Sequence, residues 1–252
     1  MALATILGFP RIGKNRELKT ALEAYWKGKT DLTALGHAAV ALRAEHWQAQ
    51  QNAGLDLLPS NDFSYYDQTL DMSALLGVIP ARYAHKGGPV EAATYFAMAR
   101  GAQRDGVDVP AAEMTKWFDT NYHYIVPEFV AGQKFAISSS KIFDEFAEAK
   151  ARGLKTRPVL IGPLTYLLRG KGVANPLTLL DAILPAYAEI LKRLEQAGAE
   201  WVQLDEPTLV LDLDEATRVA YGKAYAALRQ ATKLKLFVAT YFGSLGDNLA
   251  TA

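Results

Sequence analysis

Two adjacent carboxylates, Asp205 and Glu206, end an apolar run that begins at Trp201. Pro207 follows, and because proline has no backbone N–H to give to a sheet, it predicts a turn at this point. In α/β proteins with parallel strands, ligands and catalytic groups gather at the carboxyl ends of the strands. Either one carboxylate orients a substrate N–H or hydroxyl, or the pair is structural and accepts hydrogen bonds from neighbouring loops. The pair alone does not identify a reaction.

A second group of residues whose side chains could bind a ligand is cationic and lies near the start of the chain. It consists of Arg11, Lys14, Arg16 and Lys19. Arg16 and Lys19 are three residues apart, so they would share a face of a helix. Cations grouped in this way could receive a polyanionic substrate tail. The alternative is a solvated basic face whose charges pair with Glu17 and Glu23.

The same segment, GFPRIGKN at residues 8–15, has the spacing of a phosphate-binding loop. Two residues argue against that interpretation. Asn15 stands where Ser or Thr would meet Mg²⁺, and Pro10 removes an N–H that a phosphate cradle would use. A P-loop nucleotide hydrolase therefore remains only a remote alternative.

An aromatic stretch, EMTKWFDTNYHY at residues 113–124, places Lys116 and Asn121 among five aromatic or imidazole rings. Aromatic side chains beside a few polar groups are typical of a pocket for a flat ligand. The alternative is that the rings belong to the core. Composition leaves both interpretations open.

Composition excludes several classes of site. The chain has no cysteine, so it forms no disulfide, thiolate nucleophile or thiolate zinc site of its own. Its four histidines have no metal-ligand spacing, and we expect no metal site within the chain. Lys and Arg total 27, as do Asp and Glu, which does not favour binding of nucleic acid. We find no secretory signal and no apolar run long enough to span a bilayer, so we expect a cytoplasmic protein without membrane contacts.

The elements that must position these residues alternate between short apolar runs and amphipathic helices. Strands are predicted at residues 5–9, 55–58, 114–118, 158–161, 201–204 and 234–240. Helices are predicted at residues 16–26, 31–53, 140–152 and 176–197, and after residue 214. Nearly continuous apolar strands are typical of parallel sheets covered on both faces. The fold class is therefore α/β, either doubly wound or a (β/α)8 TIM-type barrel cut to about six of its eight units.

Five longer stretches occur in order along the chain: LGFPRIGKNRELK, LDLLPSNDFSYYD, EMTKWFDTNYHYIVPEF, RPVLIGPLTYLLRGK and WVQLDEPTLVLDL. Together they closely resemble the N-terminal half of cobalamin-independent methionine synthase, over essentially all 252 residues. The resemblance implies one of two (β/α)8 barrels packed face to face. It also implies transfer of a methyl group from 5-methyltetrahydropteroyltriglutamate to homocysteine. In that family zinc binds homocysteine, and its ligands (His, two Cys and an acid) belong to the C-terminal barrel.

The resemblance also assigns roles to particular residues. It carries folate-tail binding onto Arg16, Glu17, Leu18, Lys19 and Lys116, and more weakly onto Asn121. It implies no catalytic residue in this chain. The acid-acid-proline strand end resembles that of the catalytic barrel, and we interpret it here as structural.

The chain, residues 1–252, is interpreted as one segment of the N-terminal barrel, without the C-terminal zinc barrel that would be its partner. The isolated segment should not catalyse methyl transfer, and self-association is expected to cover its open sheet edges. The second hypothesis, from a different class, is a stand-alone binding or structural module with no catalytic role.

Overall fold

The computed structural model describes residues 2–104 and 107–252. Its centre is a four-stranded sheet formed by β1 (Leu58–Ser60), β6 (Thr156–Ile161), β7 (Trp201–Asp205) and β8 (Lys235–Ala239). The strands lie in the order β1-β6-β7-β8, and every neighbouring pair is parallel. Each new strand is added on the same side, as in a barrel, whereas a doubly wound sheet reverses direction. The α/β barrel-type fold is therefore confirmed.

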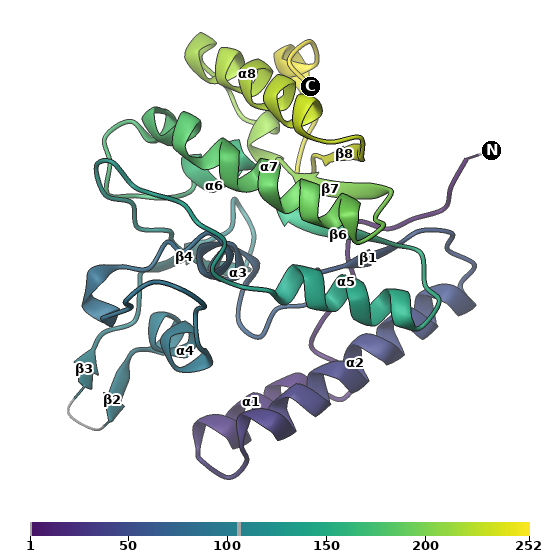
Figure 1. Cartoon of the computed structure of the whole chain (residues 1–252), viewed down its shortest axis with the longest axis vertical. Coiled ribbons are helices and arrows are strands. Elements are labelled where there is room, and N and C mark those ends of the chain that lie inside the picture. The colour runs from purple at the N-terminus through teal and green to yellow at the C-terminus, as the bar shows by residue number, and fades with distance from the viewer. Residues whose placement is uncertain (1, 105–106) are drawn as a thin grey trace.

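Eight α-helices in the described residues accompany the sheet. They are α1 (Glu17–Trp26), α2 (Leu32–Asn52), α3 (Gln68–Leu75), α4 (Ala92–Arg100), α5 (Lys141–Ala151), α6 (Pro163–Leu168), α7 (Leu180–Gln196) and α8 (Glu215–Ala231). In Figure 1, α5, α7 and α8 run along the sheet, while α1 and α2 form a pair at the far end of the molecule from α8. None of the helices in the described part of the chain has the length and apolarity to cross a membrane.

Shorter elements complete the chain. Two antiparallel hairpins join β2 (Ala102–Arg104) to β3 (Val107–Val109) and β4 (Met114–Lys116) to β5 (His123–Ile125). Short 3₁₀ turns occupy Ala81–Tyr83, Pro176–Leu179, Pro207–Val210 and Gly246–Asn248.

Side-chain caps fix where several helices begin. The Asp31 carboxylate accepts the Ala34 N–H at 2.8 Å, and the Asp214 carboxylate accepts the Thr217 N–H at 2.8 Å. A cap of this kind stabilises a helix by about 1 kcal/mol, because it satisfies a backbone donor that has no partner within the helix. Predicted and observed helix boundaries agree within a few residues. The largest difference is at residues 176–179, which form a 3₁₀ turn before α7.

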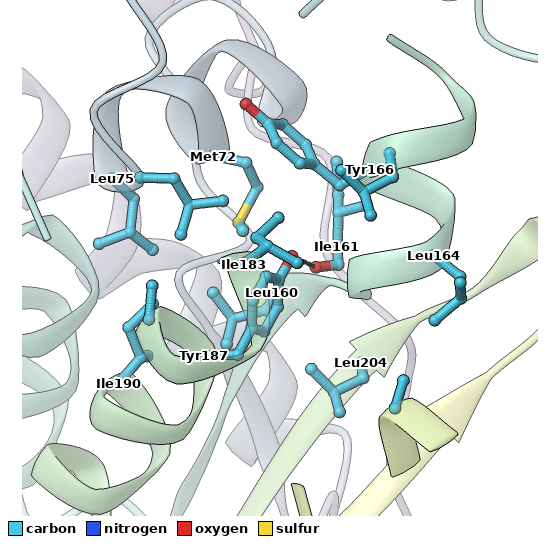
Figure 2. Close-up of a cluster of buried hydrophobic side chains, with 14 of the residues drawn as sticks. Met72, Leu75, Leu160, Ile161, Leu164, Tyr166, Ile183, Tyr187, Ile190 and Leu204 are labelled. Carbon is cyan, nitrogen blue, oxygen red and sulfur yellow. Dashed lines mark hydrogen bonds between the residues drawn. The ribbon is translucent and has the colours of Figure 1, made fainter. Parts of the chain in front are cut away.

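The main core lies between the sheet and α7. The helix buries one stripe completely, including Ile183, Tyr187, Ile190 and Leu194. Figure 2 shows Ile183 and Tyr187 beside Leu160 of β6, and all three belong to the main core cluster. Fully burying a side chain of this size stabilises the fold by about 1.5–3 kcal/mol. The Tyr187 hydroxyl donates to the Ile161 carbonyl at 2.7 Å, so this polar group is also satisfied within the core.

The predicted strand at residues 5–9 is reduced to a single parallel bridge between Thr5 and Leu57. Side chains, rather than a strand ladder, take its carbonyl groups. Arg157 donates to the Ile6 carbonyl at 2.8 Å, and Gln203 donates to the Leu7 carbonyl at 3.0 Å. The segment nevertheless follows the edge of β1, where a further parallel strand of the barrel would lie.

The predicted strand at residues 114–118 does not join the main sheet. Residues 114–116 form β4, which pairs antiparallel with β5 and is exposed along its whole length. Six barrel strands are expected from the sequence. In the described residues five strand positions of the barrel are occupied, four by strands and one by the bridge at Thr5. The difference arises because apolar and aromatic residues also stabilise a surface hairpin.

Candidate functional site

Asp205 closes β7 at the carboxyl edge of the sheet, and its side chain is almost fully buried at 6% exposure. Its Oδ1 accepts the Gln203 side-chain amide at 2.5 Å, and its Oδ2 accepts the Tyr241 hydroxyl at 3.3 Å. Burial raises the pKa of Asp205 to about 7, although both hydrogen bonds oppose that rise. The carboxyl group therefore titrates near neutral pH.

Gln203 connects Asp205 to Arg157, a fully buried arginine of β6. Arg157 donates from Nε to the Gln203 side-chain oxygen at 2.9 Å and from Nη1 to the Thr5 hydroxyl at 2.6 Å. Its guanidinium lies 4.8 Å from the centre of the Phe237 ring. These contacts join the N-terminal segment to three strands through one polar network. We did not predict this network, although an arginine directly before the apolar run at residues 158–161 is a visible signal.

Glu206 points away from Asp205 and has a different role. Its carboxylate accepts the backbone N–H groups of Leu164 at 3.2 Å and Thr165 at 2.8 Å, at the start of α6. It also accepts the hydroxyls of Tyr221 at 3.1 Å and Tyr225 at 3.0 Å, both from α8. Burial raises the pKa of Glu206, and these donors act against the rise. Glu206 therefore ties β7, α6 and α8 together, in agreement with the structural interpretation.

A cavity of about 330 Å³ opens at the carboxyl ends of β1, β6 and β7. Lys141 is the cation in the cavity lining, which also contains the carboxylates of Asp62, Asp71 and Asp205. The ammonium of Lys141 donates to the Asn61 side chain at 2.8 Å and lies 3.3 Å from Asp71. It also pairs with Glu145 at 3.2 Å. These partners surround the lysine. The network that they form joins α3, α5 and the loop after β1.

The predicted tail residues of the RELK segment lie in and before the first turn of α1. Arg16 precedes the helix in a left-handed conformation, with φ 65°, so it does not share a helical face with Lys19 as predicted. Arg16 and Lys19 are exposed, and Lys19 Nζ lies 3.7 Å from Glu23. An exposed pair of this kind contributes little energy, so Lys19 can exchange Glu23 for another anion.

Leu18 faces the protein interior, whereas Glu17 binds the loop just before it. The Glu17 carboxylate accepts the Asn15 backbone N–H at 2.9 Å and its side-chain amide at 3.0 Å. Hydrogen bonds from its own backbone N–H and from that of Asn15 hold the pKa of Glu17 below its usual value. The Leu18 side chain is 1% exposed, and its N–H donates to the Ile12 carbonyl at 3.2 Å. Both residues can shape the loop, but the Leu18 side chain is not placed to touch a ligand.

Lys116 and Asn121 belong to the β4–β5 hairpin, and both are exposed. Lys116 pairs in register with His123, and the Asn121 carbonyl lies 3.1 Å from Nδ1 of the same histidine. The loop that precedes the RELK segment contacts the hairpin through Arg11, whose guanidinium lies 5.4 Å from the centre of the Tyr122 ring. This contact joins residues that are more than 100 positions apart in the chain.

The loop at residues 8–15 does not form a phosphate cradle. Its Phe9 N–H donates to the Asp62 carboxylate at 2.8 Å, and its Asn15 N–H donates to Glu17. Carboxylates therefore occupy amide groups that a nucleotide phosphate would need. This geometry argues against the nucleotide hydrolase.

No group of three or more His, Asp or Glu side chains in the described residues is arranged to hold a metal ion. The residues described therefore do not fit a zinc site.

Residues 3–252 match the family described as "Cobalamin-independent synthase, N-terminal domain". The chain belongs to this family. It is 56% identical to 5-methyltetrahydropteroyltriglutamate–homocysteine methyltransferases from Nitrobacter winogradskyi, Xylella fastidiosa and Salinibacter ruber. These alignments cover 98–100% of the chain but only 34% of each relative, so the chain spans about a third of their length.

Solved structures of the family share the fold. A putative vitamin-B12-independent methionine synthase from Listeria monocytogenes superposes with a TM-score of 0.62 at 14% identity, over 99% of this chain and 70% of that one. A B12-independent methionine synthase from Shewanella sp. W3-18-1 gives 0.59 at 17% identity, over 85% and 55%. At such identities the likeness establishes the fold alone.

Proposed function

We propose that this family member is the folate-tail-binding, N-terminal part of a methyltransferase. The complete enzyme would move a methyl group from 5-methyltetrahydropteroyltriglutamate to homocysteine and release methionine. The observation that supports this proposal is 56% identity, over nearly the whole chain, to methyltransferases of that name.

The proposed tail site uses exposed cations from two segments. The triglutamate tail carries several carboxylates, and charge-assisted hydrogen bonds from Arg and Lys suit such groups. Arg16 and Lys19 offer charge from one side, and Lys116 offers it from the hairpin, with Asn121 beside it. Glu17 and Leu18 would contribute by holding the loop in shape.

In this proposal, methyl transfer takes place in a C-terminal partner barrel. Zinc supplied there would stabilise homocysteine as a thiolate, which is the nucleophilic form. The residues described here form no comparable metal site, so the chain alone is proposed not to transfer the methyl group. We further propose that the protein works in the cytoplasm and, when separate, self-associates through its open sheet edges.

The test of the tail site compares two ligands that differ only in their tails. Calorimetric titration would measure the dissociation constants of the chain for methyltetrahydrofolate triglutamate and monoglutamate. Lys116→Ala should weaken triglutamate binding by about 1.5–3 kcal/mol, since a charge-assisted bond is lost, and monoglutamate binding by much less. Lys192→Ala, on the exposed side of α7, is the matched control. Equal losses for both ligands, or a folded chain that binds neither, would contradict the proposed site.

A further inference from the structure

Arg11 differs from the other cations of its loop because it faces inward. Its Nη2 donates to the Tyr66 carbonyl, and its guanidinium lies over the Tyr122 ring, 5.4 Å from the ring centre. The side chain is half-buried, whereas Lys14 and Arg16 are exposed. One arginine thus joins the N-terminal loop, the segment after β1 and the β4–β5 hairpin.

The segment at residues 62–67 contacts both the N-terminal loop and the β4–β5 hairpin. Asp62 accepts the Phe9 N–H from the N-terminal loop at 2.8 Å. Asp67 accepts the Ile125 N–H from the hairpin at 3.0 Å, as well as the Thr69 N–H at 2.7 Å. The loop and the hairpin are therefore attached to the same segment, and Arg11 adds a direct contact between them.

The hairpin is held by buried side chains such as Trp117 and Tyr124, and Arg11 adds a contact at the loop between its strands. Its strands are three residues each, and β4 is exposed along its length. A two-stranded hairpin of this size is marginal unless it packs against other elements. Tyr122 is adjacent to Asn121 and to His123, the register partner of Lys116. Holding the Tyr122 ring therefore helps to set the place from which Lys116 and Asn121 reach a ligand.

We propose that Arg11 is a positioning residue that sets the spacing between the RELK cations and the hairpin cation, and thereby the preference for a long glutamate tail. The inference rests on the proposed function. Arg11 does not bind the tail itself, because its guanidinium is committed to Tyr66 and Tyr122. Cations held at a fixed spacing favour a ligand whose carboxylates match it, since less ordering is needed on binding.

The test measures the ratio of triglutamate to monoglutamate affinity in matched variants. Arg11→Met should lower this ratio roughly three- to tenfold, the range expected for losing a cation–π contact and its accompanying hydrogen bond. Tyr122→Leu should also lower it, and the double variant should lower it no further than Arg11→Met, because both single variants lose the Arg11–Tyr122 contact and Arg11→Met also loses the hydrogen bond to Tyr66. Tyr122→Phe keeps the ring face and loses only the hydroxyl, which also pairs with Arg11, so the ratio should fall less than in Tyr122→Leu.

Lys192→Met, which replaces an exposed cation on α7, is the charge control and should leave the ratio unchanged. An unchanged ratio in Arg11→Met, or additive losses in the double variant, would overturn the inference. If Arg11→Met does not fold, Arg11→Lys replaces it. That variant keeps the charge but loses the planar fork, so the ratio should still fall, and an unchanged ratio would again overturn the inference.

The outcomes also separate this inference from the function on which it rests. A parent chain without tail-length preference, or with a preference that Lys116→Ala leaves intact, would remove the proposed tail site itself. A preference that depends on Lys116 but not on Arg11 would remove only the positioning role.

Discussion

At the residue scale, two adjacent carboxylates of one strand have separate environments. Asp205 belongs to the polar network with Gln203 and Arg157, whereas Glu206 joins the start of α6 to two tyrosines of α8. Successive side chains of a strand point to opposite faces, so neighbours in sequence need not share a site. The pair therefore does not act as a unit.

The raised pKa of Asp205 predicts a pH dependence of stability. The folded pKa is about 7, against an ordinary value of 3.8, so the folded state holds this proton more tightly than the unfolded state. The free energy of unfolding should therefore fall as pH rises from 5 to 7 and level off above. The contribution of Asp205 is at most about 2–3 kcal/mol between pH 5 and 8.

Asp205→Asn removes this titration while keeping the shape of the side chain. Urea unfolding of the parent and the variant at pH 5 and pH 8 would measure the difference. Other buried acids, including Asp67, have pKa values raised in the same direction. The decisive quantity is therefore the difference between the two proteins in the slope of the free energy of unfolding against pH. Equal slopes would show that Asp205 is already ionised at pH 5.

At the element scale, α6 begins where the Glu206 carboxylate meets its first N–H groups, and Gly162 makes that approach possible. A Cβ added to Gly162 would lie 2.1 Å from Glu206 Oε1. The backbone there is extended in the ordinary region, with φ −68°, so the requirement for glycine is one of space. The sequence IGP thus encodes a helix start that depends on a carboxylate more than 40 residues later.

Gly162→Ala should destabilise the fold by about 1–3 kcal/mol, because Glu206 must move away from its buried donors. Gly222 provides the contrast, since it is an exposed interior residue of α8 where an added methyl group would meet nothing within 4 Å. Gly222→Ala should stabilise by about 0.5–1 kcal/mol through helix propensity. Thermal and urea unfolding of both variants would measure these changes, and similar effects at the two positions would contradict the role given to Gly162.

At the scale of the whole molecule, the parallel sheet ends at β8 in the described part of the chain. Lys235 donates its N–H to Glu200, and Ala239 accepts from Glu206, so the alternate residues Leu236 and Val238 direct their backbone groups to the open edge. Unpaired groups of this kind are available to another strand. Figure 1 places β8 at the end of the sheet beyond β7.

This edge predicts concentration-dependent self-association of the separate chain. Val238→Pro would remove an outward N–H and place a ring at the edge, so the variant should remain monomeric at concentrations where the parent forms dimers. Sedimentation velocity over a wide range of concentration would measure both, with circular dichroism to confirm that the variant folds. Identical sedimentation of parent and variant would count against edge pairing.

The elements that depend on local pattern could be predicted from the amino-acid sequence. Apolar runs located β6, β7 and β8, a periodic stripe located α7, and aspartates marked the starts of α2 and α8. Longer stretches identified the family. These signals suffice because burial and capping leave a regular trace over a few neighbouring residues.

Which residues meet across the fold could not be predicted from local pattern. Residues 5–9 lack a strand ladder because side chains of Arg157 and Gln203, about 150 and 196 positions away, take their carbonyls. Arg11 faces Tyr122 instead of solvent, and Asp205 and Glu206 are divided between two faces of one sheet. The physical reason is that a hydrogen bond between distant segments leaves no periodic pattern in either one. It exists only after the chain has brought the two together.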